Sequence, residues 1–337
     1  MKSHSDSPGG SRGANRRRTD LSLPENIKKI LSGRFEGRVR FDEPMANHTS
    51  FRIGGPADAI VFPESVEDLM DLLGMLDKEN VDWFVFGGGT NLLVKDGGIR
   101  GVVISPAPGL SDISVLRNEG KKVYVLAQSG VSLGRLCRFA ADMGFSGVQF
   151  AAGIPGTVGG AVMMNAGTRA GEMSSIVASV DIAFGPGDIR FVKRKNMAFE
   201  YRSLVLPFQI NVKKPGVIVS VVVSLCKDKP ERIRKEMENF LTDRKKWQPG
   251  GFSAGSFFKN PACGPSAGEL IDRAGLKGRG VGDAVVSENH ANFIINRKNA
   301  SAADVLALME IIQNRVYEAF AVNLEPEVKT IGKPICT

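Results

Sequence analysis

The stretch Gly153–Gly167, which reads GIPGTVGGAVMMNAG, decides how the rest of the chain is interpreted. Five of its fifteen residues are glycine, and the others are small or apolar apart from the amide of Asn165. Glycine lets a backbone pack close to a neighbour or adopt a positive φ angle. A segment that is both glycine-rich and apolar is typical of a buried wall around a large, partly anionic ligand. A purely structural glycine turn is the alternative that this stretch leaves open.

The composition around this stretch is that of an ordinary globular protein. The 337 residues are 42% hydrophobic and 24% charged, and the length allows two or three domains. The longest apolar run, Gly216–Cys226, is too short to span a bilayer and is expected to form a buried strand. The N-terminus lacks the apolar core of a secretory signal, so a cytoplasmic protein without membrane insertion is expected.

Charge and cysteine usage exclude several classes of site. The four cysteines are far apart and no Cys/His ligand spacing occurs, so neither a metal site nor a disulfide framework is predicted. The net charge is +8, and the Arg-rich residues 1–20 are predicted to be a disordered basic tail. Aromatic residues do not alternate with Lys and Arg as in single-strand binders, so no nucleic-acid partner is expected. The remaining basicity suits an anionic small ligand.

Hydrophobic periodicity divides the chain into three units. Residues 21–48 are predicted to be a helical lead-in, and a small strand–helix–strand unit follows over about 40–105. A second unit covers 106–226, and a third, with two long helices, covers the rest. The predicted helix starts are Ser65, Ser132, Pro230, Gly268 and Ser301, and the predicted strands are 59–62, 83–86, 92–94, 102–104, 123–127, 177–184, 189–192, 216–225 and 290–296.

A second glycine-rich stretch, Gly87–Asn91, directly follows a predicted strand. It lacks the spacing of the G-x-G-x-x-G dinucleotide fingerprint, and no Gly-Lys-Ser/Thr follows to make a P-loop. The backbone N–H groups of a Gly-Gly-Gly turn can still form an anion-binding nest. Together with Gly153–Gly167 it could grip one pyrophosphate between two small domains. This arrangement indicates a flavin dinucleotide, although the spacing alone does not separate FAD from other dinucleotides.

Six motifs connect the chain to a known enzyme family. In order they are NHTSFRIGGPAD (47–58), GGGTNLLV (87–94), AGIPGTVGGAVMMNAG (152–167), YRS (201–203), SAGSFFKNP (253–261) and LEPEV (324–328). From about residue 40 to its end, the chain resembles the UDP-N-acetylenolpyruvoylglucosamine reductase (MurB) family. It lacks a long tyrosine-bearing insertion in the second unit and so resembles the shorter, type II branch.

The resemblance implies an α+β fold with a two-part FAD-binding region of the vanillyl-alcohol-oxidase/PCMH type and a C-terminal α/β substrate-binding domain. The implied boundaries are a tail over 1–20, FAD-binding subdomains over 21–105 and 106–226, and a substrate-binding domain over 227–337. It also implies non-covalently bound FAD. The expected FAD-binding residues are Gly87, Gly88, Gly89, Thr90, Asn91, Leu92, Gly153, Ile154, Pro155, Gly156, Gly159, Gly160, Ala161, Asn165 and Gly167.

The function implied by the resemblance is a step of peptidoglycan precursor synthesis in the bacterial cytoplasm. NADPH reduces FAD, the reduced flavin gives a hydride to C3 of UDP-N-acetylglucosamine enolpyruvate, and a proton at C2 completes UDP-N-acetylmuramate. A carboxylate-conjugated alkene accepts hydride only if the developing enolate is stabilised by cationic or donor groups and then protonated by an acid. The resemblance assigns these roles to Arg202 and Glu327 at the carboxylate and to Ser256 as proton donor.

The resemblance also brings Lys259, Asn260, Lys277 and His290 near the substrate, and Lys259 or Lys277 could polarise Ser256. Two further readings stay open: an FAD-dependent carbohydrate or alcohol oxidase of similar fold, and a flavin-binding regulator without turnover. The oligomeric state is not predicted. The chain departs from the family pattern at Lys329, where an arginine is common.

Overall fold

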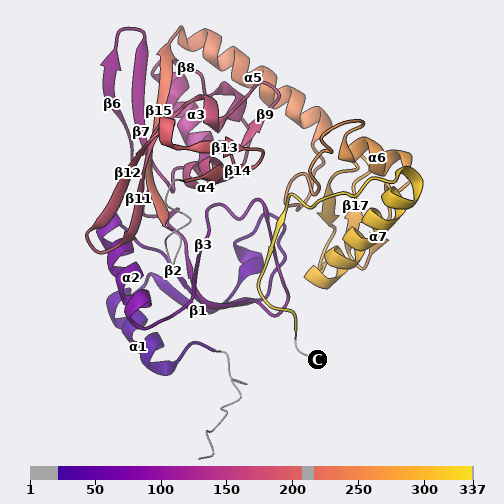
Figure 1. Cartoon of the computed structure of the whole chain (residues 1–337), viewed down its shortest axis with the longest axis horizontal. Helices are drawn as coiled ribbons and strands as arrows, with labels where there is room; N and C mark the ends of the chain where they lie inside the picture. The colour runs from indigo at the N-terminus through magenta and orange to yellow at the C-terminus, as the bar shows by residue number, and fades with distance from the viewer. Residues whose placement is uncertain (1–21, 207–215, 336–337) are drawn as a thin grey trace, which may run out of the picture.

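The computed structural model describes residues 22–206 and 216–335, so the predicted tail over 1–20 lies outside the described residues. The chain folds into three regions that lie around a common centre (Figure 1). We call them the first region (22–105), the second region (106–226) and the third region (227–335). In Figure 1 the second region forms the large sheet at upper left and the first lies beneath it. Helix α5 (Pro230–Trp247) of the third region runs along the top against the second region, and the rest of the third region lies to the right.

The first region is a mixed four-stranded sheet covered by two helices. Strand β2 and strand β3 both pair in parallel with β5, while β1 pairs antiparallel with β2, giving the order β1-β2-β5-β3. The helix between β2 and β3 begins because the Ser65 hydroxyl accepts a hydrogen bond from Asp68 N–H at 3.1 Å. The elements are α1 (Glu25–Arg34), β1 (Val39–Pro44), β2 (Pro56–Val61), α2 (Val66–Lys78), β3 (Trp83–Val85), β4 (Leu92–Val94) and β5 (Ile99–Ile104).

The second region is an antiparallel sheet of order β12-β11-β15-β7-β6, with β8 also paired to β15. Its central strand β15 is the long apolar run of the sequence. One face, with Ile218 and Val221, packs in the core that includes α3 and α4, and the other, with Val217 and Val219, packs in the core that includes α2. The elements are β6 (Ile113–Glu119), β7 (Lys122–Gln128), α3 (Leu133–Asp142), β8 (Phe145–Ser146), α4 (Val158–Met163), β9 (Gly167–Thr168), β10 (Gly171–Glu172), β11 (Val177–Gly185), β12 (Asp188–Lys193), β13 (Ala198–Glu200), β14 (Ser203–Val205) and β15 (Val217–Lys227).

The third region packs a short helix and a long helix against a three-stranded antiparallel sheet, β16-β17-β18. Its last strand, β19, leaves this core and pairs in parallel with β4 of the first region, a path that Figure 1 shows in yellow. The end of the chain therefore lies beside the loop after β3. The elements are α5 (Pro230–Trp247), α6 (Ala267–Arg273), β16 (Gly280–Val281), β17 (Ala284–Val286), β18 (Ile294–Asn296), α7 (Ala302–Phe320) and β19 (Lys329–Ile331).

The predicted α+β architecture is confirmed, but two local predictions are wrong and one strand was missed. Residues 21–48 are not helical throughout, because β1 occupies 39–44 and pairs with β2. Strand β6 was not predicted: five of its seven side chains are exposed, so it lacks a clear apolar alternation. The strand predicted over 290–296 begins only at Ile294, because residues 290–293 form a turn closed by Phe293 N–H on the His290 carbonyl.

Candidate active site

A cleft of about 630 Å³ lies where the three regions meet. Its lining combines the loop after β3, the glycine-rich stretch before and within α4, and segments that arrive from the third region. Predicted site residues that line it are Gly87, Gly88, Gly89, Thr90, Asn91, Leu92, Ile154, Pro155, Gly156, Gly159, Gly160, Ala161, Gly167, Arg202, Ser256 and Glu327. The two glycine-rich stretches and the three predicted catalytic residues therefore share one cavity.

The two glycine-rich stretches pack directly against each other. A Cβ atom on Gly88 would come within 2.7 Å of the Gly156 Cα, and one on Gly87 would come within 2.6 Å of the Thr157 hydroxyl. Neither position has room for a side chain. The Thr90 hydroxyl also donates a hydrogen bond to the Pro155 carbonyl at 3.4 Å. Close backbone contact leaves peptide groups instead of side chains along this wall, as binding a pyrophosphate requires.

The deeper wall of the cleft holds a polar atom without a partner. The Ser129 hydroxyl is buried and makes no hydrogen bond to any residue within the described ranges. It lines the cleft beside Gly159, where a Cβ would approach the Ser129 Cβ to 2.7 Å. A buried hydroxyl without a partner is costly, so this one fits a ligand with polar atoms. The size of the cleft, its glycine wall and this hydroxyl all fit FAD.

Arg202 and Glu327 form an ion pair at the cleft. The Arg202 Nε donates to Glu327 Oε1 at 2.6 Å, and the Tyr201 hydroxyl donates to Glu327 Oε2 at 3.1 Å. The Glu327 side chain is 10% exposed and that of Arg202 is 27% exposed. Burial, followed by the nearby Glu327 charge, raises the pKa of Tyr201, so this hydroxyl stays a donor at neutral pH. The pair brings together two residues that are 125 positions apart.

Ser256 reaches the cleft from the loop between α5 and α6. It follows Gly255, whose φ of +83° gives this loop a turn that favours glycine. The Ser256 hydroxyl has no hydrogen-bond partner among the residues that the structure describes, whereas its neighbour Phe257 is buried and accepts from Glu327 N–H at 2.8 Å. The backbone beside Ser256 is thus tied to the segment that carries Glu327, and the hydroxyl itself is free for a ligand.

The four predicted substrate contacts do not line the cleft. Lys259 pairs with Glu325 at 3.0 Å and Lys277 pairs with Asp272 at 2.7 Å, so both candidate partners of Ser256 are engaged elsewhere. The side chain of Asn260 accepts from Ala267 N–H at the start of α6. Their contact with substrate stays a prediction.

His290, the fourth of these residues, is half-buried. Burial, with a smaller effect of the Lys277 charge, lowers its pKa. Its ring packs edge-on against Phe293, with centroids 5.0 Å apart, and its Nδ1 accepts from Asn292 N–H. These contacts give His290 a structural role, and its contact with substrate also stays a prediction.

Comparison with known proteins identifies the family. Residues 57–193 match the model of the FAD binding domain, and residues 248–331 match that of the UDP-N-acetylenolpyruvoylglucosamine reductase C-terminal domain. The UDP-N-acetylenolpyruvoylglucosamine reductase of Desulfosudis oleivorans is 45% identical over 313 residues, which are 92% of this chain and all of that protein. The chain belongs to the UDP-N-acetylenolpyruvoylglucosamine reductase family. It has an FAD-binding domain and is an oxidoreductase, as the motifs indicated.

Further members of the reductase family are similar to this chain over most of its length. The Bacillus subtilis reductase is 42% identical over 309 residues, covering 91% of this chain and 99% of that protein. Among solved structures, the reductase (MurB) from Thermus caldophilus superposes with a TM-score of 0.71 at 36% identity, covering 85% of this chain and 97% of that one. The similarity to the family therefore extends over all three regions.

Three residues that line this reductase-family cleft or bond a residue that does were not predicted individually. Tyr201 was part of a quoted motif, but only its hydrogen bond to Glu327 shows its place in the site. Arg244, in the last turn of α5, lines the cleft and donates to the Gly153 carbonyl at 3.0 Å. Burial lowers the pKa of Arg244, and its guanidinium remains charged at neutral pH. Ser129 had no sequence signal, since nothing local shows that its hydroxyl lacks a partner.

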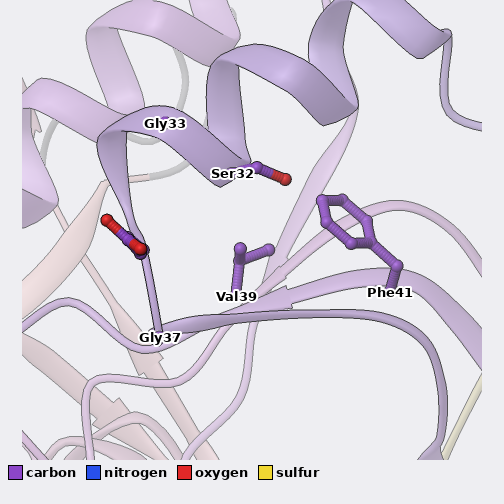
Figure 2. A pocket seen from close by; sticks show the side chains of 6 residues that line it. Ser32, Gly33, Gly37, Val39 and Phe41 are labelled. Carbon is purple, nitrogen blue, oxygen red and sulfur yellow. The ribbon is translucent and has the colours of Figure 1, made fainter.

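Other features of the molecule lie outside this site. A shallow hollow between the end of α1 and β1 is lined by Ser32, Val39 and Phe41 among others (Figure 2), and no predicted site residue borders it. Within the described ranges, no cluster of His, Cys, Asp and Glu side chains could hold a metal ion. In the same residues, no helix has the length and apolar character to cross a membrane.

Proposed function

We propose that the chain reduces UDP-N-acetylglucosamine enolpyruvate to UDP-N-acetylmuramate with NADPH as the reductant, in the bacterial cytoplasm. The observation that carries this proposal is the Arg202–Glu327 pair on a cleft lined by the two glycine-rich stretches. It is supported by membership of a family whose relatives carry the corresponding name. The two glycine-rich stretches would hold FAD, whose chemistry would be hydride transfer from NADPH to C3 of the enolpyruvyl group.

Arg202 is proposed to bind the substrate carboxylate. A guanidinium offers two parallel N–H groups that match a carboxylate, and its charge stabilises the enolate that forms as hydride reaches C3. The Nε of Arg202 donates to Glu327, and no residue in 22–206 or 216–335 accepts from the other two guanidinium nitrogens, which a substrate carboxylate could therefore contact. Tyr201 and Arg202 together hold both oxygens of Glu327, which orients this carboxyl group beside the same site.

Ser256 is proposed to give the proton to C2. Its hydroxyl borders the cleft and has no hydrogen-bond partner within the described part of the chain, so it can turn toward a bound enolate. A serine hydroxyl is a weak acid and needs a polarising neighbour. Because Lys259 and Lys277 pair with carboxylates elsewhere, the group that polarises Ser256 has to approach with the substrate or from the cleft wall.

Anaerobic flavin reoxidation tests this proposal. NADPH should bleach the FAD spectrum of the purified protein, and UDP-N-acetylglucosamine enolpyruvate should restore it rapidly. Ser256→Ala should leave the bleaching unchanged and slow the restoration by about 10²- to 10⁴-fold, the usual contribution of a positioned acid.

Other outcomes would favour the two alternative functions. Restoration by oxygen but not by the enolpyruvyl substrate indicates an oxidase, and a protein that takes up no FAD contradicts both enzyme functions. Ser256→Ala reoxidised at the wild-type rate would show that another group is the proton donor.

A further inference from the structure

Two asparagines of the glycine-rich stretches donate hydrogen bonds to backbone carbonyls at or near Arg202 and Glu327. The Asn165 side-chain amide donates to the carbonyl of Glu200 at 3.2 Å, two residues before Arg202. The Asn91 side-chain amide donates to the carbonyl of Glu327 itself at 3.1 Å. Each bond joins a stretch that borders the FAD cleft to one half of the ion pair.

The peptide group at Glu200 matters because Arg202 has an unfavourable backbone. Strands β13 and β14 are joined by a two-residue turn, Tyr201-Arg202, and Arg202 has a φ of +57°. For a residue other than glycine, this φ costs on the order of 1 kcal/mol or more. Such a conformation persists only where neighbouring contacts hold it. The Asn165 amide anchors the residue from which the turn begins.

Asn165 lies behind the cleft surface, between Met164 and Ala166, which line it. It is 2% exposed and does not line the cleft. Its Oδ1 accepts from Ser174 N–H at 3.0 Å, so both ends of its amide are bonded to protein. Asn91 is also bonded twice to the chain end. Besides its side-chain bond to Glu327, its backbone carbonyl accepts from Lys329 N–H at 3.1 Å, where β19 begins.

We propose that Asn165 and Asn91 are positioning residues, which hold Arg202 and Glu327 in register with each other and with the cofactor cleft. The proposal rests on the roles given above to Arg202 and Glu327. It changes the role expected for Asn165 from cofactor contact to alignment of the catalytic pair. It also gives a reason why the glycine-rich stretches carry amide side chains: the same loops form the cleft and fix the groups that act in it.

Two substitutions that remove the side-chain donor of Asn165 test the proposal. Asn165→Asp keeps the acceptor for Ser174 and tolerates the φ of +41° at this position, but it removes the donor to Glu200. Asn165→Gly also suits this φ, and it avoids a new charge beside Glu172. Both variants should lower kcat/KM for the enolpyruvyl substrate by about tenfold, because small misplacements of catalytic groups are costly. FAD content and the rate of flavin reduction by NADPH should stay within about twofold of wild type.

The matched control is Asn296→Asp. Asn296 is equally buried and uses its amide in the same pattern, donating to the Phe51 carbonyl and accepting from Ala300 N–H, but away from the cleft. It should lose stability without the selective loss of the substrate step. Asn91→Ala serves as a second test if the Asn165 variants do not fold. Because Asn91 also lines the cleft, its readout is the hydrogen exchange of the backbone amides of 327–329, which should be faster than in wild type, and unchanged exchange there would overturn the inference.

Hydrogen exchange separates this proposal from the proposed reaction. The backbone amides of 201–205 should exchange faster in Asn165→Asp and Asn165→Gly than in wild type or in Asn296→Asp. If the wild type does not reduce the enolpyruvyl substrate, the proposed function fails while exchange still decides the positioning role. Unchanged exchange in these variants, or wild-type kcat/KM in an active enzyme, would overturn the inference.

Discussion

At the scale of single residues, the cleft contains hydroxyl groups without a protein partner and a backbone conformation that is unfavourable. Ser129 has a buried hydroxyl without a protein partner in the described residues, and Ser256 has a free hydroxyl at the cleft. Arg202 has a backbone conformation that most side chains avoid. The buried hydroxyl of Ser129 and the backbone of Arg202 each cost stability in the ligand-free chain, and such costs concentrate at functional sites.

Ser129→Ala tests the orphan hydroxyl. If this hydroxyl bonds FAD, the variant should bind FAD about tenfold more weakly, the size expected for one buried hydrogen bond. The ligand-free protein should be as stable as wild type or slightly more stable, because an unsatisfied polar atom is removed. The two readouts are a titration of apoprotein with FAD and thermal unfolding without it. Unchanged FAD affinity would rule out the contact, and a destabilised apoprotein would indicate a structural hydrogen bond instead.

At the scale of elements, β19 is the strand that delivers Glu327. Its parallel pairing with β4 places Lys329 opposite Leu92, so the loop after β3 and the chain end form one unit. Local sequence did not predict this strand, because three residues, two of them exposed, have no apolar periodicity. The pairing depends on the packing of the third region beside the first.

Lys329→Pro tests whether the pairing of β19 positions Glu327. Proline removes the N–H that Lys329 donates to the Asn91 carbonyl and should shift Glu327 from Arg202. We expect kcat/KM for the enolpyruvyl substrate to fall at least tenfold, with a loss of about 1–3 kcal/mol in the free energy of unfolding. Lys329→Ala, which keeps the N–H, is the control for the charge. Equal losses in both variants would assign the effect to the ammonium group and not to the strand.

At the scale of the whole molecule, the first and third regions are fastened by polar contacts between distant segments. The two carboxylate oxygens of Asp96 accept from Ala302 and Ala303 N–H, at 2.8 and 2.9 Å, at the start of α7. The Ser50 hydroxyl donates to the Ser253 carbonyl at 2.7 Å, in the loop that carries Ser256. Closure of the cleft by the third region therefore depends on groups of the first.

Asp96→Ala should loosen this closure. Losing a helix cap costs about 0.5–2 kcal/mol, and here the lost cap also joins two regions. We expect lower stability together with a higher KM for the enolpyruvyl substrate and an unchanged rate of flavin reduction by NADPH. Ser301→Ala is the matched control, because Ser301 caps the same helix from within the third region. Its stability should fall by a similar amount without the rise in KM, and an equal rise in KM would refute the closure role.

Local sequence determined the features that rest on nearest neighbours. The helix starts at Ser65, Ser132 and Ser301 are set by hydroxyls that bond N–H groups three residues away, so they could be predicted. The ordered motifs were sufficient to indicate the family and the FAD-binding fold, which the comparisons confirmed. Strands β1 and β6 could not be predicted, because their partners and not their own residues make them strands.

Only the tertiary structure decided how the opening stretch is used. The sequence indicated that Gly153–Gly167 is a wall, and most of it lines the cleft. The fold turns Gly153 toward Arg244 of α5 and gives the Asn165 amide to the turn that carries Arg202. It also pairs Arg202 with Glu327 across 125 positions. Such contacts join segments that no local preference brings together, because their geometry follows from how the three regions pack.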